Sequence, residues 1–314
     1  MSKTRERGQI LETSGSWVRV RLLSSDEEIQ ARLRGRFRLD ERTSTQPATI
    51  GDRVEWTRND DGTGTIEKIL PRDNYLPRKA THGRQGEQLL VANVDRAWVV
   101  VSIRSPRLKE GFIDRFLVLC EAHDVPAGIL VNKMDLANER ERRQVASMIS
   151  VYESLGYPVL ATEAVRPETV KKIESALPEG ISVFIGPSGV GKSTLLNVLN
   201  ASFERKTADV SSSSSKGKHT TTTAVLLPLG NGQWIADTPG IRELGLVGVD
   251  PAELSLYFPE MAHRRSDCKY YNCTHSHEPG CAVMQALEDG KIDPERYHSY
   301  LQMLDSITDS GHNA

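Results

Sequence analysis

The chain has 314 residues, of which 38% are hydrophobic. This is enough apolar sequence for more than one buried core, so a largely disordered protein is excluded and two or three domains are expected. Its 40 basic and 42 acidic residues give a formal net charge of -2, which neither favours nor excludes a nucleic-acid partner. The first residues are polar and the longest apolar runs are far too short to span a bilayer, so we expect a soluble, cytoplasmic protein with no membrane partner.

Residues 1–72 alternate short apolar segments with turn residues, a pattern typical of a small all-β unit. Few helical signals interrupt it. The sequence therefore predicts a five-stranded β-barrel of the oligonucleotide-binding type. Its strands are expected at Gln9–Glu12, Val18–Leu22, Ile29–Arg38, Val54–Arg58 and Gly64–Leu70.

Four arginines lie at every second position of the third predicted strand, namely Arg32, Arg34, Arg36 and Arg38. Because side chains alternate between the two faces of a strand, all four guanidinium groups share one face. That face is either a solvated exterior or a surface that follows RNA phosphates. The second interpretation is slightly favoured, since small five-stranded barrels often bind oligonucleotides on a strand face.

Residues 73–244 have a different hydrophobic pattern. After a polar stretch over Pro71–Glu87, apolar strands alternate with amphipathic helices predicted near 111–123, 138–155 and 167–176. This alternation predicts an α/β domain with a parallel sheet. The strands are expected at Arg96–Ile103, Ala127–Val131, Pro158–Ala161, Ile181–Ile185, Val225–Leu229 and Gln233–Ala236.

A glycine-rich loop connects the strand at 181–185 to an apolar, periodic segment that predicts a helix. The backbone N–H groups of such a loop, with the positive end of the helix, cradle phosphate oxygens. Lys192 is then expected to reach the β and γ phosphates as a catalytic group, and Ser193 to bind Mg²⁺. A purely structural turn is a much weaker interpretation. The phosphate-binding residues predicted are Gly186, Pro187, Ser188, Gly189, Val190, Gly191, Lys192, Ser193 and Thr194.

A base-reading motif, Asn132-Lys133-Met134-Asp135, follows the strand at 127–131. In GTPases the carboxylate of such an aspartate accepts hydrogen bonds from guanine N1 and N2, which adenine cannot supply, and the lysine stem packs on the purine ring. A site built for those bonds rejects the analogue that lacks them. Alone, this motif could be an asparagine-capped helix start. At the carboxyl end of a strand in the sheet of a phosphate loop, it predicts GTP binding.

Two further segments have the character of nucleotide-sensing switches. Asp237 can hold Mg²⁺ through water, and the N–H of Gly240 can sense the γ-phosphate. Upstream, the hydroxyl of Thr221 or Thr222 can reach the same Mg²⁺. Ile241 stands where many GTPases carry the glutamine that orients water, so either the enzyme is degraded or another group positions the water. His219 is the candidate for that catalytic role, with a plain surface histidine as the alternative.

The motifs occur in a rotated order, because 132–135 precede 186–193, which precede 237–240. This order, with GPSGVGKS, KHTTT and DTPG, closely resembles the ribosome small-subunit-dependent GTPase family of circularly permuted bacterial GTPases. The resemblance covers nearly the whole chain. It implies an N-terminal oligonucleotide-binding-type barrel, a permuted P-loop GTPase domain and a C-terminal zinc-binding domain. It also implies a role in late maturation of the small ribosomal subunit, with GTP hydrolysis to GDP and phosphate stimulated by that subunit and its rRNA.

One departure from the family pattern concerns the segment after the third strand of the core. The family often has a Ser-Ala-type motif there, whereas this chain has Ala161-Thr162-Glu163-Ala164. Secondary contacts to the guanine O6 are therefore in doubt, while the role predicted for Asp135 is unaffected.

Three of the four cysteines lie in residues 245–314, the third expected domain. Cys268, Cys273, His275 and Cys281 offer three thiolates and one imidazole, which suit a structural, tetrahedral Zn²⁺. His277 is the competing nitrogen ligand. Nearby cations and tyrosines suit RNA or a solvated rim about equally; they are Arg264, Arg265, Lys269, Tyr270 and Tyr271. A helix is expected to start at Asp293-Pro294.

Two other classes of function stay open at this point. An RNA-binding adaptor that binds GTP without hydrolysing it is motivated by Ile241, and a GTP-driven metal-insertion protein by the cysteine cluster. The leading hypothesis is a GTPase that acts on the small ribosomal subunit with Mg²⁺ and one Zn²⁺, as a monomer.

Overall fold

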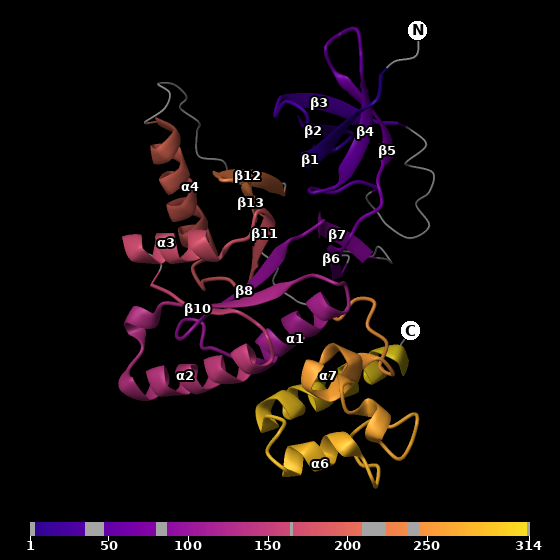
Figure 1. The fold of residues 1–314 in the computed structure, drawn as a ribbon, viewed down its shortest axis with the longest axis vertical. Helices are drawn as coiled ribbons and strands as arrows, with labels where there is room; N and C mark the ends of the chain where they lie inside the picture. The colour runs from indigo at the N-terminus through magenta and orange to yellow at the C-terminus, as the bar shows by residue number, and fades with distance from the viewer. Residues whose placement is uncertain are drawn as a thin grey trace.

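The computed structural model describes residues 4–34, 47–79, 87–163, 166–208, 224–237 and 245–312. A β-barrel, a helix-covered sheet and a helical C-terminal unit follow one another along the chain (Figure 1). No helix within these ranges is both long and apolar enough to cross a membrane.

The five-stranded barrel is confirmed. Its strands are β1 (Glu6–Ser14), β2 (Trp17–Leu22), β3 (Glu28–Leu33), β4 (Arg53–Arg58) and β5 (Gly64–Ile69). They pair in the order β1-β2-β3-β5-β4, and β4 returns to β1, which closes the barrel. Every second side chain of β2 is buried, as the apolar alternation requires. The barrel core includes Ile10, Val20, Trp56 and Ile66.

The third strand is shorter than predicted. It ends at Leu33, because Arg34 leaves the ladder and pairs with the nearly buried Glu67 at 2.7 Å. Arg32 lies over the Trp17 ring at 4.2 Å. Arg36 and Arg38, the other members of the predicted arginine face, lie outside the described residues.

One hairpin was not predicted. The polar stretch over Pro71–Glu87 contains strand β6 (Tyr75–Lys79), which pairs antiparallel with β7 (Glu87–Ala92). The pattern hid this hairpin, because Pro77 and Arg78 interrupt the apolar run of β6 and only Leu76 is a fully buried hydrophobic residue there.

The α/β core has a sheet in the order β10-β9-β8-β11-β13-β12. The pairings β10–β9, β9–β8, β8–β11 and β11–β13 are parallel, and β12 is antiparallel to β13. The strands are β8 (Arg96–Ser102), β9 (Ala127–Asn132), β10 (Val159–Ala161), β11 (Gly180–Ile185), β12 (Val225–Gly230) and β13 (Gln233–Asp237). The predicted strands of the core are therefore confirmed, with shifts of one residue at several ends.

Helices cover both faces of this sheet. The helices α1 (Glu110–Glu121) and α2 (Glu139–Ser154) pack on the face formed by Val99, Val101 and Val183. On the other face, α3 (Pro167–Ala176) and α4 (Lys192–Ala208) pack on Trp98, Val100 and Phe184. Successive strand residues thus serve opposite faces, which is why these strands are continuously apolar.

The barrel continues the sheet of the core. Strand β1 pairs antiparallel with β12, with Glu12 opposite Val225, so the strands of the barrel and of the core form one eleven-stranded sheet, and β6 and β7 form a separate two-stranded sheet. Leu11 of β1 is fully buried in the hydrophobic cluster of the core. Between the barrel and the core, the guanidinium of Arg21 on β2 lies 4.6 Å from the centre of the Trp234 ring on β13.

The described part of the C-terminal unit, residues 245–312, contains helices and no strand. Its elements are η3 (Leu254–Tyr257), α5 (Pro259–Ala262), η4 (Arg265–Asp267), α6 (Ala282–Glu288) and α7 (Pro294–His312). The predicted start of α7 is confirmed, because the Asp293 carboxylate accepts the N–H of Glu295 at 2.9 Å and of Arg296 at 3.2 Å.

A buried ion cluster joins this unit to the core. Arg296 of α7 pairs with Asp114 of α1 at 2.7 Å and with Glu260 of α5 at 2.8 Å. The hydroxyl of Tyr152, on α2, donates to Asp114 at 2.7 Å. Helices α1, α2, α5 and α7 therefore meet at one buried network of charged and polar side chains. This network docks the C-terminal unit on the core.

Candidate functional site

The glycine-rich loop lies between β11 and α4, at the carboxyl edge of the parallel sheet. Gly191 has a φ of 102°, and a Cβ on it would collide with the side-chain amide of Asn132. A Cβ on Gly186 would collide with the carbonyl oxygen of Val100. Glycine is therefore required at both positions for the loop to curl and to lie close to its neighbours.

Lys192, the first residue of α4, turns back over this loop. Its Nζ donates to the carbonyl oxygens of Gly186 at 2.7 Å and Pro187 at 2.8 Å. Burial lowers the pKa of the Lys192 ammonium. Ser193 and Thr194 follow it in the first turn of α4, with exposed side chains. A cation, a helix N-terminus and a curled backbone thus meet at one place, as phosphate binding requires.

The predicted base-reading motif lies beside this loop. Asn132, the last residue of β9, is fully buried, and its Nδ2 donates to the carbonyl oxygen of Val190 at 2.9 Å. Lys133 has a φ of 60°, and its Nζ donates to the carbonyl of Gly189 at 2.6 Å and of Ser105 at 2.8 Å. The two loops are therefore joined by two side chains of the motif. Met134 is buried, and Asp135 is exposed in the short helix η2 (Met134–Leu136).

Thr162 is a site residue that sequence reasoning missed. Its side chain is buried, and its Oγ1 donates to Oδ1 of Asn132 at 3.2 Å. Its carbonyl accepts the N–H of Met134 at 3.1 Å. Thr162 thus fixes the rotamer of Asn132 and the backbone position of Met134, the residue before Asp135. The available signal was a hydroxyl residue directly after β10, the strand next to β9. Ala164 lies outside the described residues.

Of the predicted switch residues, the structure describes Asp237 and not the others. Asp237 is the last residue of β13 and is half-buried. Because β13 is parallel to β11, the carboxylate lies at the same sheet edge as the glycine-rich loop. His219, Thr221, Thr222, Gly240 and Ile241 lie outside the described residues.

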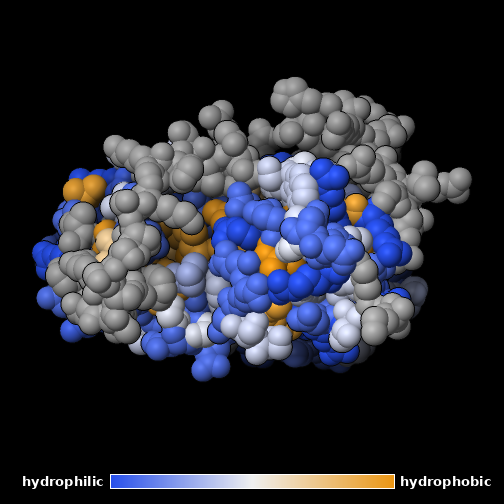
Figure 2. All heavy atoms as spheres, turned by 90° about the horizontal axis from the view of Figure 1, so that it is seen from above, coloured by the Kyte–Doolittle hydropathy of each residue, from blue (hydrophilic) through white to orange (hydrophobic). Residues whose placement is uncertain are grey.

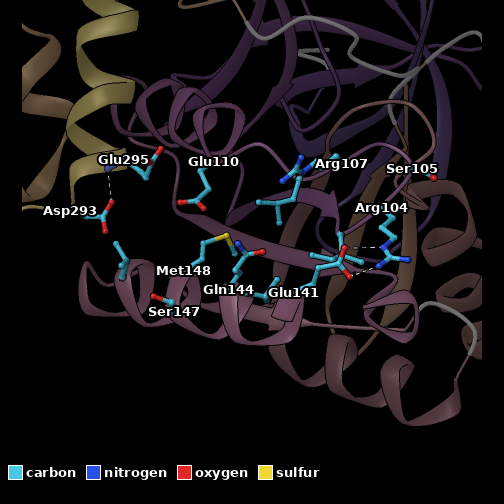
Figure 3. A pocket seen from close by; sticks show the side chains of 14 residues that line it. Arg104, Ser105, Arg107, Glu110, Glu141, Gln144, Ser147, Met148, Asp293 and Glu295 are labelled. Carbon is cyan, nitrogen blue, oxygen red and sulfur yellow. Dashed lines mark hydrogen bonds and ion pairs between the residues drawn. The ribbon is translucent and has the colours of Figure 1, made fainter. Parts of the chain in front are cut away.

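A groove of about 690 Å³ is lined in part by Ser105, whose carbonyl accepts the ammonium of Lys133 from the base-reading motif (Figure 3). It lies between the loop after β8, helix α2 and the starts of α1 and α7. At one end, the Arg104 guanidinium makes two hydrogen bonds to the Glu141 carboxylate, of 3.0 and 2.7 Å (Figure 3). Arg104 holds the pKa of Glu141 below its usual value. At the other end, burial raises the pKa of Glu110, helped by Asp114, Asp293 and Glu295.

The four predicted metal ligands lie together in the C-terminal unit. The ligand atoms of Cys268, Cys273, His275 and Cys281 all lie within 4.8 Å of one another. Nδ1 of His275 is 3.6 Å from the sulfur of Cys268 and 3.4 Å from that of Cys281. A tetrahedral ion with bonds of about 2.0 to 2.3 Å places its ligand atoms roughly 3.5 to 3.8 Å apart, so the spacing fits Zn²⁺.

The surroundings of this cluster also suit thiolates. Backbone N–H groups of Ala282 and Met284 donate to the sulfurs of Cys268 and Cys281, each at 3.4 Å. Burial raises the pKa of the Cys273 thiol to about 12, so a cation is what would favour its thiolate. His277 is exposed, and its Nδ1 is engaged with the Ser276 hydroxyl at 2.8 Å. The geometry therefore favours His275 over His277 as the nitrogen ligand.

Figure 2 shows a face that is largely hydrophilic in its described part, with small separated hydrophobic areas. Tyr271 is 99% exposed and Tyr270 40% exposed, and the ammonium of Lys269 lies 5.4 Å from the Tyr270 ring centre. Aromatic and cationic groups thus stand together in solvent near the metal cluster.

A phosphate loop and a guanine-type motif that lie side by side on one parallel sheet, although their order along the chain is rotated, define a circularly permuted P-loop GTPase. The family models for the RsgA GTPase and the RsgA N-terminal domain match residues 69–247 and 7–66. The chain belongs to the RsgA GTPase family and is a GTP hydrolase.

Relatives and solved structures agree with this assignment. The chain is 39% identical over 308 residues to a small ribosomal subunit biogenesis GTPase RsgA of Bacteroides fragilis, which covers 98% of this chain and 99% of that relative. A relative of the same name from Christiangramia forsetii is 36% identical, covering 96% and 97%.

Two crystal structures share the whole fold. That of YjeQ from Thermotoga maritima has a TM-score of 0.80 at 34% identity and covers 97% of this chain and 99% of that one. That of YloQ, described as a circularly permuted GTPase, has a TM-score of 0.78 at 30% identity and covers 98% and 96%. The rotated order of motifs is thus shared with solved relatives, which confirms the permutation.

Proposed function

We propose that one guanine nucleotide spans the two joined loops, with its base on Asp135 and its phosphates on Lys192. The observation that carries this proposal is the direct bond from Asn132 to the carbonyl of Val190, because it sets the base motif beside the phosphate loop. The phosphates then lie on the backbone of Gly186–Ser193 and the N-terminus of α4, with Thr194 in the same turn.

The phosphate end of the site supplies the groups for hydrolysis. Ser193 and Asp237, with Thr221 or Thr222, would hold Mg²⁺, and Gly240 would sense the γ-phosphate. The Lys192 ammonium stabilises negative charge on the transferred phosphoryl group, and His219 positions the attacking water in place of the missing glutamine. A cation held inside the loop, as Lys192 is, needs little reorganisation to do this.

The biological role that fits best is late maturation of the small ribosomal subunit, with turnover stimulated by that subunit. The names of the relatives support it, since each describes a small ribosomal subunit biogenesis GTPase. The barrel, residues 1–72, would bind rRNA through the face that carries Arg32 and Arg34. The protein would act in the cytoplasm as a monomer.

The C-terminal unit, residues 245–314, would hold one structural Zn²⁺ on Cys268, Cys273, His275 and Cys281. Four protein ligands leave no open position for a substrate, which supports a structural role. The hydroxyl of Tyr297 donates to the carbonyl of His275, and that of Tyr300 to Thr274, each at 2.7 Å. Helix α7 thus braces the ligand loop, so the metal would set the shape of the whole unit.

The test is single-turnover GTP hydrolysis with and without small ribosomal subunits, together with cosedimentation in GDP and in a non-hydrolysable GTP analogue. We expect faster hydrolysis with the subunit and tighter binding in the analogue. Equal rates and equal binding in both states would contradict a ribosome-stimulated switch. Competition by ATP as effective as that by GTP would contradict the base site.

A further inference from the structure

Residues 102–109, which are the last residue of β8 and the connection from it to α1, lie against the base-reading motif and are called here the loop 102–109. The N–H of Ile103 donates to the carbonyl of Asn132 at 3.3 Å. The hydroxyl of Ser102 donates to the carbonyl of Pro106 at 3.0 Å, which ties the loop onto itself. The loop is therefore ordered by contacts with the motif and by its own turn, and it can serve as a fixed support.

Lys133 is held by this loop as well as by the phosphate loop. Its ammonium donates to the carbonyl of Ser105 at 2.8 Å and to that of Gly189 at 2.6 Å. An ammonium has three N–H donors, so two of them are committed to backbone on two sides. The course of the Lys133 stem, which would face the purine ring, thus depends on where the loop 102–109 lies.

Asp135 is held from the other side, by the first turn of α2. The Arg142 guanidinium donates to the carbonyls of Met134 at 2.9 Å and Ala137 at 3.2 Å. Asn138 and Glu141 form a capping box, each accepting the backbone N–H of the other at 2.9 Å. The short helix that carries Asp135 therefore moves only with the start of α2.

Arg104 links the loop 102–109 directly to the start of α2. Its guanidinium reaches from the loop 102–109 to both carboxylate oxygens of Glu141, the capping residue of α2 (Figure 3). A planar, two-bond pair fixes orientation as well as distance. The Glu141 carboxylate also accepts the backbone N–H of Asn138, so it is fixed to the start of α2 independently of Arg104.

We propose that Arg104 is a positioning residue for guanine recognition, which acts through Glu141 to hold the Asp135 carboxylate at the distance that the guanine N1–H and N2 amine require. This inference rests on the proposed base site. Arg104 itself contacts no base. Its loss would let the start of α2 and the loop 102–109 separate, so Asp135 would meet the base less accurately.

The test compares the affinities of GDP and IDP, because hypoxanthine lacks the N2 amine that Asp135 is expected to bind. In Arg104→Gln we expect GDP affinity to fall by about two- to five-fold and IDP affinity to fall less, so the GDP/IDP ratio decreases. Arg104→Lys, which keeps the charge but not the two-bond geometry, should give an intermediate ratio. Arg53→Gln is the matched control, since Arg53, on strand β4 of the barrel, is 44% exposed against 47% for Arg104 and also pairs with a carboxylate, that of Asp73.

Equal losses for GDP and IDP, an unchanged GDP affinity, or the same change in Arg53→Gln would overturn the proposal. Asp135→Asn separates its failure from that of the base site, since an asparagine complements xanthine in place of guanine. If Asp135→Asn gains no affinity for XDP, the base site is misassigned. If it gains affinity for XDP and Arg104→Gln leaves the GDP/IDP ratio unchanged, only the role of Arg104 is wrong.

Discussion

The side chain of Asn132 donates to the backbone carbonyl of Val190, across 58 residues of sequence, and so ties the base-reading motif to the phosphate loop. On its other side, Asn132 accepts the hydroxyl of Thr162. Both partners are buried. The separation between the two halves of the nucleotide site is thus fixed by a short chain of hydrogen bonds inside the protein, and each bond in it can be tested.

The Thr162→Val substitution removes one bond from this chain while keeping the shape of the side chain. Oδ1 of Asn132 would lose its donor in a buried place, at a cost of about 1 kcal/mol. We therefore expect GDP affinity, measured by isothermal titration calorimetry, to fall by about three- to ten-fold. The control is Thr57→Val, a buried threonine in the barrel that donates to Glu67. It should lower stability and leave GDP affinity unchanged.

Lys192→Met keeps an unbranched side chain, shorter by one atom, but removes its charge. Single-turnover GTP hydrolysis should slow by about 100-fold or more, because a preorganised cation at the phosphates is lost. Lys171→Met, at an exposed position on α3, should leave the rate unaltered. A hydrolysis rate within a factor of two of the parent chain would remove Lys192 from the catalytic site.

His275→Ala should abolish metal binding, whereas His277→Ala should retain about one zinc per chain. The reason is geometric, since only the imidazole of His275 lies among the three sulfurs. Metal content by mass spectrometry and the unfolding temperature with and without a chelator measure the effect. Zinc retained by the first variant and lost by the second would reverse the ligand assignment.

Arg296→Met should be strongly destabilising, because it leaves the buried carboxylates of Asp114 and Glu260 without their cation. We expect a loss of about 3 to 5 kcal/mol in the free energy of unfolding at pH 7. Lys291→Met, which breaks an exposed pair with Asp289, should cost far less. Urea unfolding followed by circular dichroism measures both.

The destabilisation in Arg296→Met should depend on pH. Burial already raises the pKa of Asp114 in the parent protein, and removal of the cation should raise it further. A carboxyl group whose folded-state pKa is raised favours the folded protein at low pH, since the neutral acid needs no partner. The stability deficit should therefore shrink as the pH falls below 7. A deficit that stays constant down to pH 4 would exclude this origin.

Local constraints made much of the architecture predictable. The phosphate loop needs glycine where a Cβ would collide, as at Gly191. The residues that meet this requirement lie in one short stretch of sequence, so the loop could be recognised from the sequence. The strands of the core were recognisable because burial on both faces makes them continuously apolar. The start of α7 was recognisable from the capping aspartate and the proline after it.

The parts that escaped prediction depend on distant partners. The role of Thr162 is evident only from its contact with Asn132, 30 residues away. That of Arg104 is evident only from its contact with Glu141, 37 residues away. Arg104 belongs to no motif with fixed spacing, and Thr162 lies in a segment that departs from the family pattern. The hairpin of β6 and β7 escaped because proline and arginine interrupt a strand whose apolar content is low. In each case the tertiary contact, and not the local pattern, defines the role.

The pairing of β1 with β12 has a consequence for truncated forms of the protein. Strand β12 has β13 along one side, and on its other side Val225 pairs with Glu12 of the barrel. Deleting the barrel would uncover an unprotected strand edge together with the apolar surface that Leu11 covers. Such edges recruit strands from other molecules. A GTPase core expressed without its first domain should therefore self-associate into oligomers or precipitate, and this association would reflect the missing neighbouring strand rather than a failure to fold.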